Sequence, residues 1–517
     1  MAMESIRRAR RVRSSVSGVL TRHYAALLFI ILYLIIGLST LHPLHHWGGD
    51  FAQYIFQARA IVENGTLLDT NYIFNGQISP LTYPPGFSIL LAPFYAAFGL
   101  DLQWLKIPPF VSLGFCLVAL YLIFNQIHSR SVALGAISLF ALSPYIWTTR
   151  QEILSEFLFM LLSFFALYTN SRVSSKDLVK CISLSILTGL LIAGAYMTRQ
   201  TGWILFIAIV ASNIFQIRDK RSLISVAAIV SMFLISYLSF NTGFGGAGHE
   251  VSAARFCWNC WSTNFATYYK SLLTVIYSIG YGPSPYRLAD FMAVSAVLSV
   301  AAGLALCLWK AFRKQSPETH LFLRAIRSIS ALDLFFGGSL LLLLILPFAV
   351  APRYLLPVIP IVFFYILVTI NAVSGSTRRL RWLFPVTVIG ALSFYVITDI
   401  NFHKRANALV LEGAVTSNTR DLYAYVKQNL TAEDLVLVSK PRVFVLYTRR
   451  RATIWNKNVS PENILDDVKN RGITHLILGK KWSGLPTKRW MFSHSIIMRN
   501  TKVVYEDTYF RMLKFSR

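Results

Sequence analysis

An isolated acid follows the first long apolar segment of the chain. The segment runs from Tyr24 to Leu41, and Asp50 comes shortly after it, in Trp47-Gly48-Gly49-Asp50-Phe51. A carboxylate beside a membrane span is costly to keep near lipid unless it has a task. Asp50 could cap the helix that the pattern predicts from Phe51 to Glu63, and capping is compatible with acid–base chemistry.

A second acidic segment stands between two later apolar segments. It reads Arg150-Gln151-Glu152-Ile153-Leu154-Ser155-Glu156-Phe157. Ser155 or Glu156 could begin the next helix, where the helix dipole favours an acid. Two or three carboxylates on the face that carries Asp50 would also suit the binding and deprotonation of a sugar hydroxyl.

Two arginines lie between strongly apolar segments. Arg199 is in Met197-Thr198-Arg199-Gln200-Thr201-Gly202, and Arg353 is in Ala351-Pro352-Arg353-Tyr354-Leu355-Leu356-Pro357. A guanidinium without a partner is expensive there, so each should meet a carboxylate or a lipid phosphate. Its fork of donors binds two phosphate oxygens at once. A structural salt bridge to Asp50 or Glu156 is the alternative.

The composition predicts a polytopic membrane protein. The chain has 517 residues, of which 55% are hydrophobic and 14% charged, and its mean hydropathy is +0.52. No soluble domain of this size needs so much apolar sequence. Lysine and arginine outnumber acids by 50 to 23, but much of this charge sits in short loops, where it orients a membrane protein. We therefore expect no nucleic-acid partner.

Hydropathy predicts about eleven spans within residues 24–400, after a basic cytoplasmic tail at 1–23. The predicted spans are 24–41, 106–125, 132–147, 156–170, 181–198, 201–217, 222–240, 287–308, 333–350, 355–373 and 382–400. Alternate loops are basic, which puts them in the cytoplasm with the N-terminus. Their basic residues are Arg130, Arg172, Lys176, Lys180, Arg218, Lys220, Arg221, Lys310, Arg313, Lys314, Arg324, Arg327, Arg378, Arg379 and Arg381.

Three regions are then expected outside the inner (plasma) membrane. They are a long first loop at 42–105, a loop at 241–285, and the tail from 401 to 517. The apolar stretch from Pro85 to Phe98 is short for a crossing and predicts a helix along the membrane surface. The tail alternates helical and strand-like patterns, which predicts a small extracytoplasmic α/β domain. The fold class is thus mainly α, with this domain at the C-terminus.

The chemistry-bearing motifs resemble those of the GT-C glycosyltransferases. They are the first-loop aspartate, Tyr83-Pro84-Pro85-Gly86, the segment from Arg150 to Glu156, and Arg353-Tyr354-Leu355-Leu356-Pro357. The nearest branches are the bacterial protein-mannosyltransferase-like and aminoarabinose-transferase-like enzymes. Each motif alone is weak, but their order agrees with the predicted topology.

The resemblance implies an inverting transfer of a sugar from a polyprenyl-phosphate donor to an extracytoplasmic acceptor. Asp50 would be the catalytic base, and Glu156 would match the family's acid at the start of its fourth span. Arg353 would hold the lipid phosphate, with help from Arg199. The remaining residues that we assign to substrate binding are Tyr354, Arg150 and Tyr83. Membrane lipids, the lipid-linked donor and a glycolipid, polysaccharide or protein acceptor are the partners implied.

The chain departs from the family where many relatives have two adjacent acids, since Gly49 precedes Asp50 and Phe51 follows it. The resemblance requires no cofactor. Some relatives bind a divalent metal through loop acids and histidines, and the candidates for such a site here are His249, Glu250, His42, His45 and His46.

Other readings stay open at this level. Cys257 and Cys260 could form a loop disulfide, remain unpaired, or serve a metal or redox role. A lipid-linked glycan ligase or polymerase would share the membrane architecture. A transporter would instead place charged or Gly/Pro-broken positions in mid-span, whereas these acids and arginines cluster at span ends.

Overall fold

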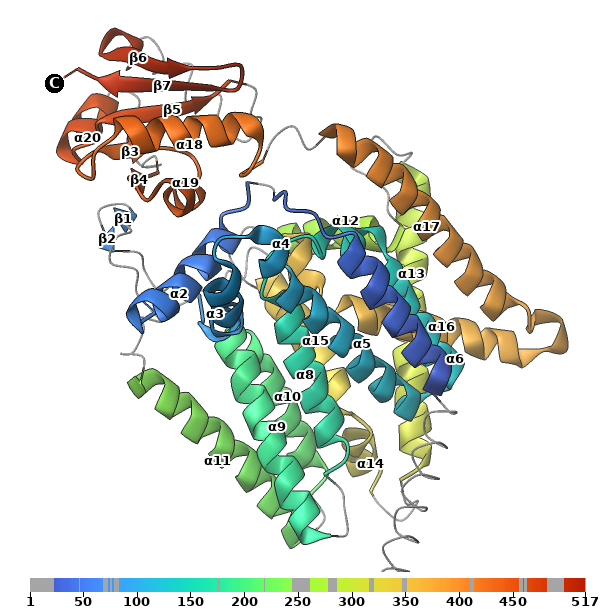
Figure 1. The fold of residues 1–517 in the computed structure, drawn as a ribbon. Helices are drawn as coiled ribbons and strands as arrows, with labels where there is room; N and C mark the ends of the chain where they lie inside the picture. Colours follow the sequence, from blue (N-terminus) through green and yellow to red (C-terminus); the bar gives the residue numbers. More distant parts are fainter. Residues whose placement is uncertain are drawn as a thin grey trace, which may run out of the picture.

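The computed structural model describes residues 23–45, 47–67, 73–74, 77–78, 83–173, 177–217, 219–243, 261–277, 286–315, 320–345, 351–409, 413–454, 459, 463–480 and 497–516. A helical bundle carries a small mixed sheet at one of its ends (Figure 1). This agrees with the expected class. Cys257, Cys260, His249, Glu250 and His46 lie outside the described residues.

The bundle is built from long apolar helices in two groups. In the first, α5, α8, α9 and α11 follow one another as neighbours, and in the second α6 and α13 both pack on α16. One continuous core runs through both groups. The helices are His23–Ser39, α5 Ile107–Ile127, α6 Arg130–Leu142, α7 Pro144–Thr149, α8 Glu156–Asn170, α9 Leu178–Thr198, α10 Gly202–Phe215, α11 Lys220–Gly243, α12 Trp261–Tyr277, α13 Tyr286–Arg313, α14 Leu321–Arg327, α15 Ala331–Ile345, α16 Ile359–Ser376 and α17 Leu383–Leu409.

Six helical stretches among the described residues are long and apolar enough to cross a membrane. They are Leu102–Ile127, Leu178–Thr198, Lys220–Ser239, Val294–Arg313, Ile359–Ser376 and Arg378–Ile400. The pair α14 and α15, bent by 77°, would make a seventh. The other predicted spans also fall on helices, but these are shorter. A multi-pass membrane protein is thus confirmed, and the number of about eleven stays a prediction.

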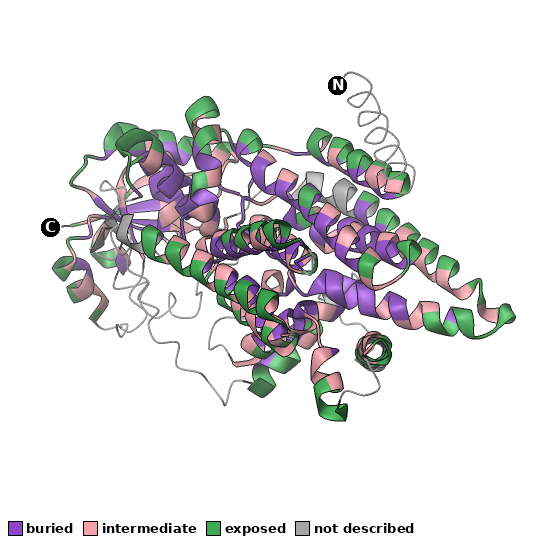
Figure 2. Ribbon diagram, turned by 90° about the horizontal axis from the view of Figure 1, so that it is seen from below, coloured by how far each residue is buried: buried purple, intermediate pink, exposed green. Residues whose placement is uncertain are grey.

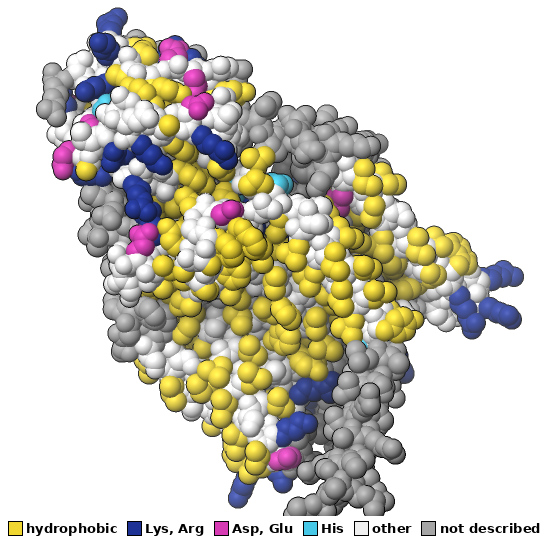
Figure 3. Space-filling view, in the orientation of Figure 1, with side chains coloured by type: hydrophobic (Ala, Val, Ile, Leu, Met, Phe, Trp, Pro, Cys, Tyr) yellow, Lys and Arg dark blue, Asp and Glu magenta, His cyan; other side chains and the backbone are white. Residues whose placement is uncertain are grey.

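The surface of the molecule matches a lipid environment. Buried residues run through the centre of the bundle, while its outer helices are exposed along one side (Figure 2). The exposed side chains on the flank of the bundle are mostly apolar, and lysine and arginine gather at its lower end, at the turn between α16 and α17 and on the C-terminal domain (Figure 3). An apolar flank between charged ends is typical of membrane proteins.

The first loop forms a helical layer between the bundle and the C-terminal domain (Figure 1). Its elements are α2 Asp50–Asn64, the short strands β1 Ile73–Phe74 and β2 Gln77–Ile78, α3 Gly86–Phe98 and α4 Leu102–Leu105. The helices expected after Asp50 and after the double proline are both present. That α3 lies along a membrane surface stays a prediction.

The helices α4, α12, α14 and α19 lie where the sequence patterns predict none. The stretch expected as a loop at 241–285 contains α12, which buries Asn264, Tyr268 and Val275 at helical spacing. In the tail, Pro441 begins the helix α19 Pro441–Thr448, where proline suits the first turn because its missing N–H needs no partner.

The C-terminal domain is a five-stranded mixed sheet with helices on both faces. The strand order is β4-β3-β5-β7-β6, with β3 parallel to β4 and β5, and β7 antiparallel to its neighbours. On β3, Val436 faces the core shared with α18 and α19, whereas Leu435 and Leu437 face the core on the side of α20. The elements are α18 Ser417–Asn429, β3 Leu435–Leu437, β4 Arg451–Thr453, α20 Ile464–Asn470, β5 His475–Gly479, β6 Thr501–Glu506 and β7 Phe510–Phe515.

A single hydrophobic core joins the first-loop helices to this domain. Phe51 and Ile55 of α2 belong to the same buried cluster as Val443 and Phe444 of α19. The N–H of Ala414 also donates to the carbonyl of His45 at 3.0 Å. The domain is therefore docked on the helix that carries Asp50.

We predict that Phe444→Ala loosens this docking. The ring is 2% exposed, and its loss leaves a cavity that should cost about 3–5 kcal/mol of unfolding free energy. Hydrogen exchange measured by mass spectrometry should show faster exchange in α2 peptides. Val503→Ala, at an exposed position on β6, is the control, and unchanged protection of α2 in Phe444→Ala would contradict the shared core.

Candidate active site

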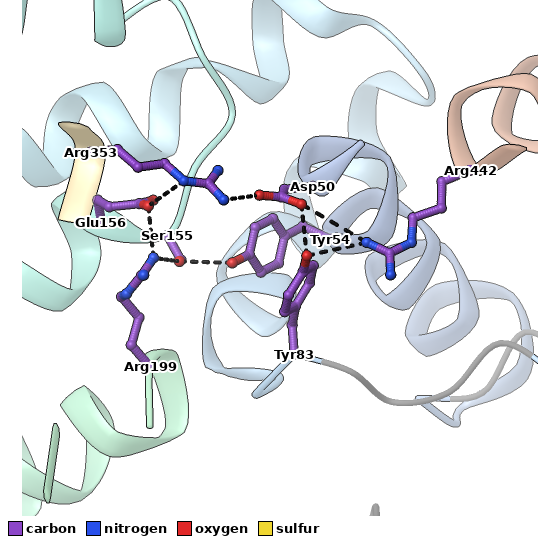
Figure 4. A network of polar contacts seen from close by, with 8 residues as sticks. All are labelled: Asp50, Tyr54, Tyr83, Ser155, Glu156, Arg199, Arg353 and Arg442. Atoms are coloured by element: carbon purple, nitrogen blue, oxygen red, sulfur yellow. Dashed lines mark hydrogen bonds and ion pairs between the residues drawn. The ribbon is translucent and has the colours of Figure 1, made fainter. Parts of the chain in front are cut away.

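Polar side chains from distant parts of the chain meet at the end of the bundle that faces the C-terminal domain. Asp50, Glu156 and Arg353 form one connected network, as the sequence predicts (Figure 4). Its other members are Tyr54, Tyr83, Ser155, Arg199 and Arg442. Three guanidinium groups thus face two carboxylates, which leaves an excess of positive charge.

Asp50 stands in the first turn of α2, and its carboxylate is bound on both oxygens. Gly49 is the N-cap and contributes no side-chain cap, so Asp50 does not serve as the capping residue. Oδ2 is paired with Arg353 Nη2, and Oδ1 accepts a hydrogen bond from the Tyr83 hydroxyl at 2.7 Å. The carboxylate therefore faces the cluster.

The backbone before α2 is fixed by two buried cations. Lys106 is fully buried and donates to the carbonyls of His42 and Leu44 at 2.7 and 2.6 Å. Arg150 is also fully buried and donates to Gly37 O and Thr40 Oγ1, at the end of the helix His23–Ser39. A cation at a helix C-terminus is favoured by the dipole. These contacts fix the backbone that leads into α2.

Tyr83 is positioned by α2 and α3 together. Gln57 Nε2 donates to the Tyr83 carbonyl at 3.0 Å, and Ser88 Oγ donates to Gln57 Oε1 at 2.7 Å. A Cβ on Gly86 would come within 2.8 Å of the Met197 carbonyl. Only glycine allows this approach, which brings the double-proline segment against the end of α9.

Glu156 begins α8 and anchors the arginines on the bundle side of the cluster. Its Oε1 lies 2.7 Å from Arg199 Nη1 and 3.8 Å from Arg353 Nε. Arg199 Nη1 also donates to Ser155 Oγ at 3.2 Å, and Ser155 Oγ lies 2.8 Å from the Tyr54 hydroxyl. Arg199 is the C-cap of α9, immediately before the tight turn into α10.

Some buried polar atoms of the site make no hydrogen bond. Within the described residues, Arg353 Nε and Glu156 Oε2 are buried and make no hydrogen bond. Such atoms are rare in folded proteins and call for an explanation. A ligand with acceptor oxygens near Arg353 and a hydroxyl near Glu156 would satisfy both.

The charges of the cluster set its pKa values. Burial favours a neutral Asp50, but the Arg353 guanidinium, the Tyr83 hydroxyl and Arg442 outweigh it and hold the pKa of Asp50 below its ordinary value. Burial raises the pKa of Glu152 to about 7, and the neighbouring Glu156 carboxylate adds to this rise. Burial would lower the pKa of Arg353, yet Glu156 and Asp50 outweigh it and raise that pKa, so the guanidinium stays charged.

Comparison with known families matches one region of the chain. Residues 82–243 match the family described as dolichyl-phosphate-mannose-protein mannosyltransferase. A comparison with curated proteins finds no match.

Solved structures extend the similarity over most of the chain. ArnT from Cupriavidus metallidurans, in the apo state, aligns with a TM-score of 0.56 and 14% identity, over 96% of this chain and 98% of that one. The Archaeoglobus fulgidus oligosaccharyltransferase aligns with a TM-score of 0.60 and 12% identity, over 87% and 67%. The arabinofuranosyltransferase AftD from Mycobacteria aligns with a TM-score of 0.54 and 13% identity, over 96% of this chain and 40% of that one. The chain has the GT-C glycosyltransferase fold.

Two of these relatives have also been solved with lipid phosphates. ArnT has a structure bound to undecaprenyl phosphate, which aligns here with a TM-score of 0.53, 12% identity and coverage of 95% and 98%. The Archaeoglobus oligosaccharyltransferase has one with an inhibitory peptide and a dolichol-phosphate, with a TM-score of 0.57, 12% identity and coverage of 89% and 70%.

Within this GT-C fold, most predicted site residues lie together, and Arg150 does not. Tyr354 lies beside the cluster, with the guanidinium carbons of Arg353 and Arg199 at 5.3 and 5.7 Å from its ring centre. Arg150 instead stacks on Trp147 at 3.7 Å and braces the first helix. Its guanidinium donates to the Gly37 carbonyl and the Thr40 hydroxyl, and a role in substrate binding stays a prediction.

Sequence reasoning missed Arg442, which comes from the first turn of α19. Its Nη1 lies 3.9 Å from Asp50 Oδ1 and 3.2 Å from the Tyr83 hydroxyl. A cation in the first turn of a helix opposes the helix dipole, so an arginine directly after a helix-starting proline was the available signal of an anionic partner.

The described histidines do not form a metal site. No group of three or more His, Cys, Asp or Glu able to hold a metal occurs in the described part of the chain. His45 Nε2 accepts the N–H of Ile153 at 3.3 Å, and its ring stacks on Phe51. The other candidates for a metal site, His46, His249 and Glu250, lie outside the described residues, so metal binding by them stays a prediction.

We predict that protonation of Glu152 makes the free energy of unfolding depend on pH. Its pKa rises from 4.5 to about 7 on folding, so the folded state holds a proton that the unfolded state has lost between these values. The free energy of unfolding should therefore fall as pH rises from about 4.5 to 7, and level off above. In thermal unfolding of the full chain in nanodiscs, Glu152→Gln should lack this fall.

Glu433→Gln is the matched control, since Glu433 is 91% exposed and should reproduce the wild-type curve. Parallel curves for wild type and Glu152→Gln across this range would show that Glu152 titrates normally.

Proposed function

We propose that the protein transfers a sugar from a polyprenyl-phosphate donor to a hydroxyl of an acceptor, with inversion at the anomeric carbon. The observation that carries this proposal is the ion pair between Asp50 and Arg353 at the end of a GT-C bundle. It supports the proposal because a carboxylate, which can act as a base, and a guanidinium, which can bind a phosphate, lie next to each other where helices of the bundle end.

Arg353 is the proposed ligand of the donor phosphate. Its Nε has no hydrogen-bond partner among the described residues, and a guanidinium offers two parallel donors to phosphate oxygens. The excess of positive charge in the cluster favours the singly charged phosphodiester of the donor and, still more, the second negative charge that develops as polyprenyl phosphate leaves. The undecaprenyl phosphate of ArnT and the dolichol-phosphate of the oligosaccharyltransferase, both lipid phosphates, support the same donor class.

Asp50 is the proposed base. As the acceptor hydroxyl attacks the anomeric carbon, its proton passes to an Asp50 oxygen and the new C–O bond forms. The bond from the anomeric carbon to the phosphate oxygen breaks, and its electron pair leaves with polyprenyl phosphate. Arg353 stabilises the charge that grows on this leaving group. Asp50 then loses its proton to water.

The neighbours of this pair hold it in place. Glu156 keeps Arg353 and Arg199 at the bundle side, and Arg199 adds a second charge near the phosphate. Tyr83 orients Asp50 through its hydrogen bond, and the ring of Tyr354 lies beside both guanidiniums. We place this site at the outer face of the inner membrane, because basic loops at the other ends of the predicted spans favour the cytoplasm.

We predict that Asp50→Asn lowers transfer by a factor of about 10²–10⁴, the usual contribution of a general base. The measurement is release of undecaprenyl phosphate from a panel of undecaprenyl-phosphate monosaccharides in membranes that contain the full chain. Asp421→Asn, at an exposed position on α18, is the control and should keep full activity. Full activity of Asp50→Asn would remove Asp50 as the base.

Arg353 has a separate expected effect. Arg353→Lys should weaken binding of undecaprenyl phosphate by about tenfold or more, because the lysine keeps the charge but loses the two-pronged donor. Binding is measured on the purified chain in nanodiscs. Unchanged affinity in a variant that unfolds at the wild-type temperature would contradict phosphate binding by Arg353.

A further inference from the structure

Asp50 is held by two arginines that come from different parts of the fold. Arg353, from the 3-10 turn Pro352–Leu355, binds Oδ2, whereas Arg442, from α19 of the C-terminal domain, approaches Oδ1. Figure 4 shows the two guanidiniums on opposite sides of the carboxylate.

A carboxylate in this arrangement is a weak base. Two neighbouring guanidiniums and the Tyr83 hydroxyl stabilise its charged form, and a group that holds its charge this well accepts a proton poorly. The proposed function requires that Asp50 take a proton, so its partners must change when the substrates bind.

The donor accounts for one of the two arginines. When Arg353 turns to the donor phosphate, its contact with Asp50 weakens. Arg442 remains beside Oδ1 and the Tyr83 hydroxyl, and donor binding alone does not displace it. The side chain of Asp50 is 23% exposed, so solvent can reach it, and a strong base beside the anomeric carbon at this stage would let water take the sugar.

We propose that the acceptor is anionic and that its acidic group draws Arg442 away from Asp50, so that the base becomes effective only when both substrates are bound. This rests on the proposed function. The side chain of Arg442 is 18% exposed, so part of it is accessible to an acceptor. Its contact with Asp50, at 3.9 Å, is longer than a hydrogen bond, and its hydrogen bond to the neutral Tyr83 hydroxyl measures 3.2 Å. A phosphate or carboxylate offers Arg442 stronger, charge-assisted hydrogen bonds than these contacts.

The docking of the C-terminal domain makes Arg442 a fixed feature of the site. Val443 and Phe444, the next residues of α19, are buried in the core shared with α2. The backbone of Arg442 is therefore held in place, while its long side chain can turn. The domain thus contributes acceptor recognition directly beside the reacting atoms.

The test uses three acceptor probes, below their micelle-forming concentrations: octyl glucoside, its 6-phosphate, and octyl glucuronide. Their binding is measured on the full chain in nanodiscs saturated with undecaprenyl phosphate. The wild type should bind at least one anionic probe about tenfold more tightly than octyl glucoside, and Arg442→Ala should abolish this difference. The phosphate and carboxylate probes separate the two kinds of anionic acceptor.

A second readout is hydrolysis of the donor in the absence of acceptor. Here water gives its proton to Asp50 and its oxygen to the anomeric carbon, and free sugar and polyprenyl phosphate are released. Arg442→Ala should raise this rate at least about threefold, because Asp50 loses a restraining charge. Arg420→Ala, which removes an exposed charge from α18 of the same domain, should change neither hydrolysis nor probe binding.

Equal wild-type affinity for all three probes would overturn the proposal, and so would unchanged or slower hydrolysis in Arg442→Ala. These failures differ from failure of the proposed function. In that case Asp50→Asn would retain activity or Arg353→Lys would bind undecaprenyl phosphate normally, whatever Arg442 does.

Discussion

The ion pair between Asp50 and Arg353 is the interaction on which the architecture of the site depends. The two residues are far apart in the sequence, on the first turn of α2 and on a 3-10 turn before α16. Their pairing fixes the first loop against the late helices of the bundle. Glu156 and Arg199 extend the pair into the bundle, and Tyr83 and Arg442 extend it towards the C-terminal domain.

Ion pairs hold this network together, although some of its polar atoms make no hydrogen bond. Three guanidiniums surround two carboxylates, and the ion pairs between them join the first loop, the bundle and the C-terminal domain. Arg353 Nε and Glu156 Oε2 nevertheless lack hydrogen bonds among the described residues. These atoms lie beside the Asp50–Arg353 pair, where the oxygens of a phosphate or a sugar could bond to them.

The sequence predicts those members of the network whose charge stands at the end of an apolar segment. Asp50, Glu156, Arg199 and Arg353 share that feature, and the membrane makes it informative because charges there are costly. Arg150 shares it too, yet its guanidinium is used to cap the first helix through Gly37 and Thr40. The free-energy cost of a charge near the membrane indicates that the charge has a partner. It does not show whether that partner is a backbone carbonyl or a substrate.

Arg442 lies beyond such reasoning, because its apolar segment is too short to suggest a membrane span and its partner depends on how one domain docks on another. The strand and helix order of the tail follows from local patterns, as in β3 and α18. The placement of α19 on α2 follows from the shared core of Phe51, Ile55 and Phe444, and long-range packing of this kind leaves no local signature.

The most direct measurement is an experimental structure of the full chain with undecaprenyl phosphate bound. The account predicts that the phosphate lies against Arg353, that the contact between Arg353 and Asp50 is broken or lengthened, and that Arg442 still lies beside Asp50. A phosphate bound away from Arg353, with the Asp50–Arg353 pair intact, would contradict it.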